Sequence, residues 1–221
     1  MVPNVWAIMQ AGNLFVFCVN NPVMWIDPSG RTIILSGSEE DRVIILDNLN
    51  ELTDHTLDFN RTTGRLEIVA WADSDNINFA YGNRLIERLI NNRDTITIKI
   101  NHTHISGNFW DPAGGRGILN HTILFDPNFM TDERPAFIGL AHELIHGHFV
   151  ARERHVFGST YEATFIPNPM SPLRSTHMVR EVRNIEYAVI GIGEFNIRGD
   201  ITENMIRAEH GIAERRRYFT R

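Results

Sequence analysis

The sequence predicts an α+β domain in which helices pack on a small mixed sheet. Short runs of alternating apolar and polar residues, typical of strands, lie at residues 57–72, 94–100 and 118–127. Segments with apolar residues at helical spacing lie between and after them, and the longest, 131–155, contains the run "HELIH". With 221 residues, of which 43% are hydrophobic, the chain is long enough to bury one substantial core.

Composition narrows the class of protein. The net charge of −6 argues against a nucleic-acid binder, which usually carries a basic excess. Cys18 is the single cysteine, so neither a disulfide framework nor a cysteine-rich zinc site is expected. The apolar start "VWAIMQAGNLFVFCV" has no Lys or Arg before Arg31 and is short and interrupted by polar residues. We therefore expect neither a signal peptide nor membrane insertion.

The first part of the domain is expected to contain two strand segments and two helices. "RTIILSG" (31–37) reads as a strand, and residues 38–56 as a helix capped by Ser38 or Ser36, with acidic residues in its first turn. Residues 57–72 alternate around a Thr-Gly turn and predict a hairpin. "NRLIERLINN" (83–92) predicts a second, short helix.

Two further strands are expected on either side of a glycine-rich loop. "DTITIKI" (94–100) alternates strictly, and "ILNHTILFDP" (118–127) follows the loop at 106–117. We expect "HTILFDP" (121–127) to be the edge strand that lines a cleft. An extended peptide can add to such an edge through main-chain hydrogen bonds.

The helix expected at 131–155 begins with Thr131 or Asp132 as its cap and has Pro135 early, where the missing N–H costs little. Its core-facing apolar residues are Phe137, Leu140, Leu144 and Phe149.

That helix carries a candidate metal site. His142 and His146 are four residues apart and therefore project from the same face, and Glu143 follows the first histidine. This H-E-x-x-H pattern offers two imidazoles to zinc and a carboxylate that can act as general base toward water. Without a metal, the helix would place these polar groups against a stripe that must be buried, which is unfavourable. His148 and His155 are expected to be solvated or to support the ligands.

The third ligand must come from elsewhere. The metzincin pattern would need Gly and His at positions 149 and 152, which are Phe149 and Arg152. Residues 176–195 predict a helix that ends at Gly191 or Gly193. Its inward face favours Glu186 as the third ligand, and Glu181 is the second candidate. The acidic residues that could serve are Glu162, Glu181, Glu186, Glu194, Asp200 and Glu203.

The tail predicts a last helix, capped by Asp200 or Thr202 and stopped by Gly211. It is followed by three arginines and Tyr218. In H-E-x-x-H peptidases, a tyrosine hydroxyl or a guanidinium commonly helps zinc to stabilise the oxyanion of the tetrahedral intermediate. Arg215 and Tyr218 are the candidates for this role. The alternative is a frayed basic C-terminus.

Residues 13–30, "NLFVFCVNNPVMWIDPSG", resemble the end of the core of Rhs (YD-repeat) proteins. The Asn-Asn-Pro and Asp-Pro-Ser-Gly elements of that pattern are present, whereas Phe15 and Phe17 replace its usual tyrosines. In polymorphic toxins the variable toxin domain begins just after this DPxG segment. The resemblance implies that residues 1–30 end a carrier shell and that residues 31–221 are the toxin domain.

"PAFIGLAHELIHGHF", with "EYAVIGIGEFNIRGDITENMIRAEHGIAERRRY", resembles the NleD-like effector zinc metallopeptidases. The resemblance implies a zincin-like domain over residues 31–221 that binds Zn²⁺. That pattern tends to end in Arg-x-x-Tyr, a spacing similar to that of clostridial neurotoxin light chains, which favours Arg215 and Tyr218 over the neighbouring arginines. The family's effectors cleave host signalling kinases, but no residue here indicates a particular target. Residues 147–176 fit the pattern poorly and are expected to be a toxin-specific loop.

The sequence thus leads to the hypothesis of a zinc-dependent endopeptidase, a toxin or effector that cleaves a target-cell protein with Glu143 as general base. The metal ligands would be His142, His146 and Glu186. A carrier or secretion system would deliver it, with an Rhs shell and an immunity protein as further partners. The alternatives are a nuclease-type Rhs toxin domain and an inactive zinc-binding module.

Overall fold

The computed structural model describes residues 33–92, 94–103, 107–111, 120–131, 134–152, 158–166 and 176–218. The chain separates into two units, Met1–Gly30 and Arg31–Arg221, and all described residues belong to the second. The predicted carrier segment, residues 1–30, lies outside the described part of the chain.

A four-stranded mixed sheet forms one side of the domain, in the order β1-β4-β6-β5. Strands β1 (Ile33–Ser36), β4 (Thr95–Ile100) and β6 (Asn120–Phe125) are parallel, and β5 (Phe109–Asp111) runs antiparallel to β6. Alternate side chains of the parallel strands enter the core: Ile33, Leu35, Ile96, Ile98, Ile123 and Phe125.

The prediction of an edge strand at 121–127 was wrong. β6 lies between β4 and β5, and β5 is the edge strand at this side of the sheet. β5 comes from the segment predicted as a glycine-rich loop. A strand of three residues is too short to produce a recognisable alternation, so the sequence pattern did not reveal it.

The other predicted elements of the N-terminal half are present, although the first helix ends at Asn50, six residues before its predicted end. Helix α3 (Glu39–Asn50) begins with a capping box, because Ser38 Oγ accepts from the Asp41 N–H (3.1 Å) and Asp41 Oδ2 accepts from the Ser38 N–H (3.0 Å). The predicted hairpin is formed by β2 (Thr56–Phe59) and β3 (Leu66–Ala70). Helix α4 (Ala80–Ile90) begins three residues earlier than expected.

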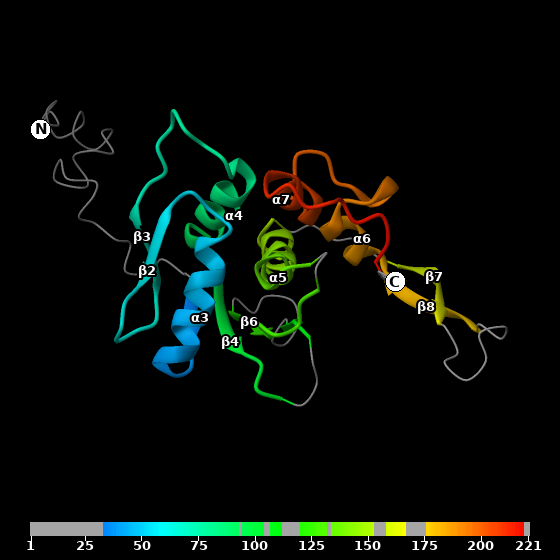
Figure 1. Cartoon of the computed structure of the whole chain (residues 1–221), viewed down its shortest axis with the longest axis horizontal. Coiled ribbons are helices and arrows are strands. Elements are labelled where there is room, and N and C mark those ends of the chain that lie inside the picture. The colour runs from blue at the N-terminus through cyan, green and yellow to red at the C-terminus, as the bar shows by residue number, and fades with distance from the viewer. Residues whose placement is uncertain are drawn as a thin grey trace, which may run out of the picture. The chain divides into compact units, whose positions relative to one another are not determined.

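Helix α5 (Ala136–Ala151) is central (Figure 1) and contacts α3, α4, β5 and β6 as well as two C-terminal helices, α6 (Asn184–Ile190) and α7 (Glu203–Glu209). Every residue from 138 to 149 is buried. The expected cap at Thr131 or Asp132 was wrong: the helix begins after Pro135, which has no N–H and no capping side chain. Among the described residues, no helix is long and apolar enough to cross a membrane.

The C-terminal half corrects two predictions. Residues 147–176 were expected to form a loop, but α5 continues to Ala151 and β7 spans Ser159–Ile166. The helix expected over 176–195 is a strand in its first part: β8 (Thr176–Arg183) pairs antiparallel with all of β7, and only α6 is helical. The pairing supplies β8 with hydrogen bonds that the isolated segment lacks. A short 3₁₀ helix, Gly193–Phe195, precedes α7, whose cap is Thr202 as predicted.

Candidate metal centre

Two imidazoles meet on the buried face of α5. His142 and His146 lie one turn apart, with ring centroids separated by 5.0 Å, and they are 3% and 8% exposed. The apolar residues around them, among them Leu140 and Leu144, are buried because α5 is covered by helices and by the sheet. The helix therefore holds both histidines away from bulk water.

Glu186 on α6 completes the cluster. Its Oε2 lies 3.2 Å from Nε2 of His142 and 3.2 Å from Nε2 of His146, and the three potential ligand atoms lie within 4.8 Å of one another. Two imidazole nitrogens and one carboxylate oxygen are the donor set of many catalytic zinc sites, which keep a fourth position open for water or substrate. The residues present therefore fit a zinc ion.

The end of α6 is fixed by a glycine. Gly191 has φ +88°, and the Ile192 and Gly191 amides donate to the carbonyls of Tyr187 and Ala188. A Cβ at Gly191 would lie 2.7 Å from Thr202 Oγ1, so the close approach of the chain before α7 also requires glycine. This turn joins the helix that carries Glu186 to the segment that caps α7.

The electrostatics of the cluster favour a bound cation. Burial opposes the ionisation of Glu186, but hydrogen bonds with His142 and His146 outweigh it and hold its pKa well below the usual range. Burial likewise opposes protonation of His142, yet hydrogen bonds with Glu186 and Glu203 raise its pKa to about 9. Ionised Glu186 thus faces Nε2 of both histidines, and together with Glu203 it stabilises positive charge at the His142 ring.

Glu203, at the start of α7, contacts the Nδ1 side of the His142 ring. Its Oε2 lies 2.8 Å from Nδ1 of His142 and 3.0 Å from Nη1 of Arg215, and its Oε1 lies 3.1 Å from Nη1 of Arg207. Burial raises the pKa of this carboxyl, but the hydrogen bond and the charges of His142, Arg215 and Arg134 lower it to about 2. A carboxylate that accepts from Nδ1 directs Nε2 toward a metal.

The sequence had offered Glu203 only as one of six candidate ligands. Its partner in the structure is Nδ1 of His142, a contact that depends on the packing of α5 against α7. A local signal existed in Arg207, four residues later on the same helix, because this spacing predicts an ion pair.

Glu143 is 6% exposed and lies beside His142 on α5. Its negative charge helps to raise the pKa of His142. It also contributes to the raised pKa of Tyr218, which burial and the charges of Glu186 and Glu143 bring to about 12. Glu143 therefore lies within electrostatic reach of both groups, and the Tyr218 hydroxyl keeps its proton at neutral pH.

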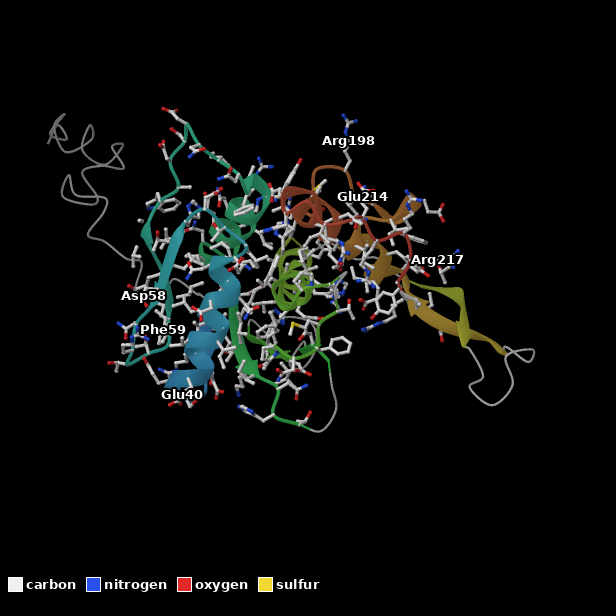
Figure 2. The ribbon with its side chains drawn as sticks, in the orientation of Figure 1. Glu40, Asp58, Phe59, Arg198, Glu214 and Arg217 are labelled. Atoms are coloured by element: carbon white, nitrogen blue, oxygen red, sulfur yellow. The ribbon has the colours of Figure 1, made fainter. Side chains whose placement is uncertain are left out.

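The C-terminal segment returns to this site through Arg215. Its backbone N–H donates to Asn204 Oδ1 (2.8 Å) and its carbonyl accepts from Asn204 Nδ2 (2.9 Å). Its guanidinium binds Glu203, donates to the carbonyl of Tyr218 and lies over the Tyr218 ring. Arg215 is 8% exposed, whereas Arg216 and Arg217 are exposed, the latter labelled in Figure 2. Only one of the three arginines thus turns toward the cluster.

The other candidate residues of the sequence lie outside the cluster of His142, His146 and Glu186. Glu181 is exposed on β8 and pairs in register with Tyr161 of β7. His148 is buried against Arg88 of α4 (Nε2 to Nη1, 3.3 Å), so it is not solvated. Asp200 binds Arg152 (2.6 Å). His155 lies outside the described residues.

A family model described as an effector protein, in peptidase family M91, matches residues 46–218, which is more than three quarters of the chain. No curated protein and no solved structure matches the chain.

Proposed function

The chain belongs to the M91 family of effector peptidases, and from this premise we propose that it is a zinc-dependent endopeptidase that cleaves a protein of a target cell. One observation carries the proposal: α5 and α6 bring His142, His146 and Glu186 together next to Glu143. Membership of the family supports peptidase activity on a protein of a host cell. The two imidazoles and the carboxylate support a bound metal.

The proposed chemistry assigns a role to each buried group. A zinc ion held by the three ligands would supply Lewis-acid catalysis, polarising the scissile carbonyl and making water more acidic. Glu143 would take the proton from the attacking water and pass it to the leaving amine. Tyr218 and Arg215 would donate hydrogen bonds to the oxyanion of the tetrahedral intermediate. Glu203 would hold His142 and Arg215 in place.

The sheet edge offers a binding mode for the substrate. β5 is an antiparallel edge strand, pairs only with β6 among the described strands, and contacts α5. We infer that a substrate chain adds to β5 in extended form, with main-chain hydrogen bonds that hold the peptide over α5. The proposed arrangement would correspond to the zincin-like architecture expected from the sequence, with β5 in place of β6.

The delivery context is also a proposal. The DPxG motif supports an Rhs carrier shell that ends at Gly30 and a toxin domain that begins at Arg31. We propose an immunity protein in the producing cell as a further partner of such a toxin. The family is consistent with delivery into a host cell by a carrier or secretion system.

The decisive experiment compares wild-type and Glu143→Ala protein in a cell lysate and identifies new protein N-termini. Wild-type protein should contain about one zinc and generate new N-termini. Glu143→Ala should keep its zinc and its fold, because the carboxylate is not a ligand, and should lose activity by about 10²–10⁴-fold. Glu194→Ala, a change at an exposed acid, is the matched control.

Two results would contradict the proposal. One is near-normal cleavage by Glu143→Ala. The other is degradation of plasmid DNA, assayed in parallel, without any new N-termini in the lysate, which would restore the nuclease hypothesis.

A further inference from the structure

Gly139 marks a second polar location on the face of α5 that carries the metal site. It precedes His142 by three residues and Glu143 by four, so it lies on the same face, one turn earlier. One turn corresponds to about 5.4 Å along the helix. The absence of a side chain at Gly139 leaves room there for side chains from two other segments.

The first of these is Arg134. The backbones of Thr131 and Arg134 exchange two hydrogen bonds of 3.0 Å, and the Arg134 N–H lies 3.1 Å from Thr131 Oγ1, which fixes the residue just before α5. The Arg134 Cζ lies 3.8 Å from the position of a Cβ built on Gly139. Its Nε is buried and has no hydrogen-bond partner among the described residues.

The second is Asn108, directly before the edge strand β5. Its Oδ1 accepts from the Asp126 N–H (2.7 Å), which directs the Nδ2 group to the other side. Asp126 Oδ2 in turn accepts from the Gly107 N–H (3.1 Å), so the segment is anchored twice. The Nδ2 group faces Gly139 so closely that a Cβ there would collide with it. It too is buried and has no partner in the described part of the chain.

Two buried donors without acceptors at one location are unusual in a folded protein, because buried polar groups are normally paired. Arg134 also lacks a directly bonded counter-charge among the described residues. No ion pair among the described residues involves Arg134, and the nearby carboxylate of Glu203 is already shared by Arg207 and Arg215. An ionised carboxylate binds a guanidinium more strongly than a neutral carbonyl does.

We propose that Arg134 Nε and Asn108 Nδ2 form a subsite for the carboxylate of an Asp or Glu side chain of the substrate. The inference rests on the proposed peptidase function. A peptide that pairs with β5 passes Asn108 at the start of that strand. One helical turn separates Gly139 from Glu143, and a strand rises about 3.3 Å per residue, so the acidic residue lies one or two positions from the scissile bond.

The test uses a peptide library prepared from a cell proteome and digested by zinc-loaded protein. Wild-type enzyme should cleave sites enriched in Asp or Glu at one position within two residues of the cut. Arg134→Gln should lose that enrichment. Arg198→Gln, a change at an exposed arginine that projects away from the ribbon (Figure 2), should keep it. Zinc content and circular dichroism verify that each variant is folded.

A pair of synthetic peptides, with Glu or Gln at the selected position, then measures the contribution. The ratio of kcat/KM for Glu over Gln should be about 10- to 100-fold in wild-type enzyme and close to one in Arg134→Gln. Arg134→Glu should reverse the preference toward Lys or Arg, and this holds even if the absolute rate falls.

Cleavage by wild-type enzyme without an acidic preference would overturn the subsite and leave the peptidase function intact. An unchanged preference in folded Arg134→Gln would do the same. Absence of any cleavage by wild-type enzyme, with zinc bound, would overturn the peptidase function and the subsite that rests on it.

Discussion

At the scale of single residues, Glu181 and Glu186 show how strongly the backbone decides where an acidic side chain lies. They are five residues apart in a segment that read as one helix. The strand-to-helix change at Asn184 separates them, so Glu181 stays exposed on β8 while Glu186 enters the core beside both histidines.

Substitution of Glu186 by Gln should lower zinc affinity strongly, because it removes the charged oxygen between the two imidazoles. The matched variant Glu181→Gln should leave affinity unchanged. Competition with a fluorescent zinc chelator measures both dissociation constants. If Glu181→Gln weakens zinc and Glu186→Gln does not, the third ligand has been assigned to the wrong residue.

Tyr218→Phe should lower the turnover number by about 10- to 1000-fold, with zinc content and KM little changed, because the hydroxyl is proposed to act on the transition state. Its pKa near 12 means that the hydroxyl stays a donor across the working pH range. Steady-state kinetics on a validated peptide measure the effect, with the exposed Tyr81→Phe as control. Unaltered turnover in Tyr218→Phe would show that the Tyr218 hydroxyl does not take part in catalysis.

At the scale of elements, α7 is joined to two other helices by an acidic residue near each of its own ends. Glu203 begins the helix and binds His142 of α5. Glu209 ends it, and its carboxylate accepts from the backbone N–H groups of Tyr81 (2.6 Å) and Gly82 (3.1 Å) at the start of α4. Because Phe79 provides no side-chain cap, Glu209 satisfies the first amides of α4 instead.

These two acids allow a comparison within one helix. Glu203→Gln should lower zinc affinity by about 10- to 100-fold, since it removes the charge that orients His142 and leaves two buried arginines without their full counter-charge. Glu209→Gln should leave zinc affinity unchanged and cost about 0.5–2 kcal/mol of stability, as loss of a cap does. Zinc competition and urea denaturation separate the two effects. Equal zinc affinities in the two variants would show that Glu203 does not contribute to zinc binding.

At the scale of the whole molecule, the predicted boundary at Gly30 has a direct consequence. If residues 1–30 end a carrier shell, their strands complete another structure and contribute little to the core around α5. A protein that begins at Arg31 should therefore fold, bind zinc and keep its activity.

The measurement is a thermal melt, a zinc analysis and the peptide assay on the shortened and full-length proteins. A melting temperature within a few degrees and equal turnover are expected. Failure of the shortened protein to fold would show that the first 30 residues belong to the catalytic domain.

Features that depend on neighbours along the chain can be predicted from the sequence. The spacing of His142 and His146 places both on one helical face whatever surrounds the helix, and Ser38 and Thr202 cap their own helices. The parallel strands β1, β4 and β6 were also recognisable, because residues buried in a sheet are apolar at alternate positions.

Features that depend on partners distant in the chain become visible in the folded structure alone. Glu186 and Glu203 reach the same histidine from different helices, and no local pattern encodes that meeting. β8 is a strand because β7 pairs with it, and β6 is interior because a three-residue strand covers its edge. Asn108 and Arg134 both lie next to Gly139, although they are 26 positions apart in the chain. Hydrogen bonds and burial made over such separations outweigh local helix preference, which amounts to less than about 1 kcal/mol per residue.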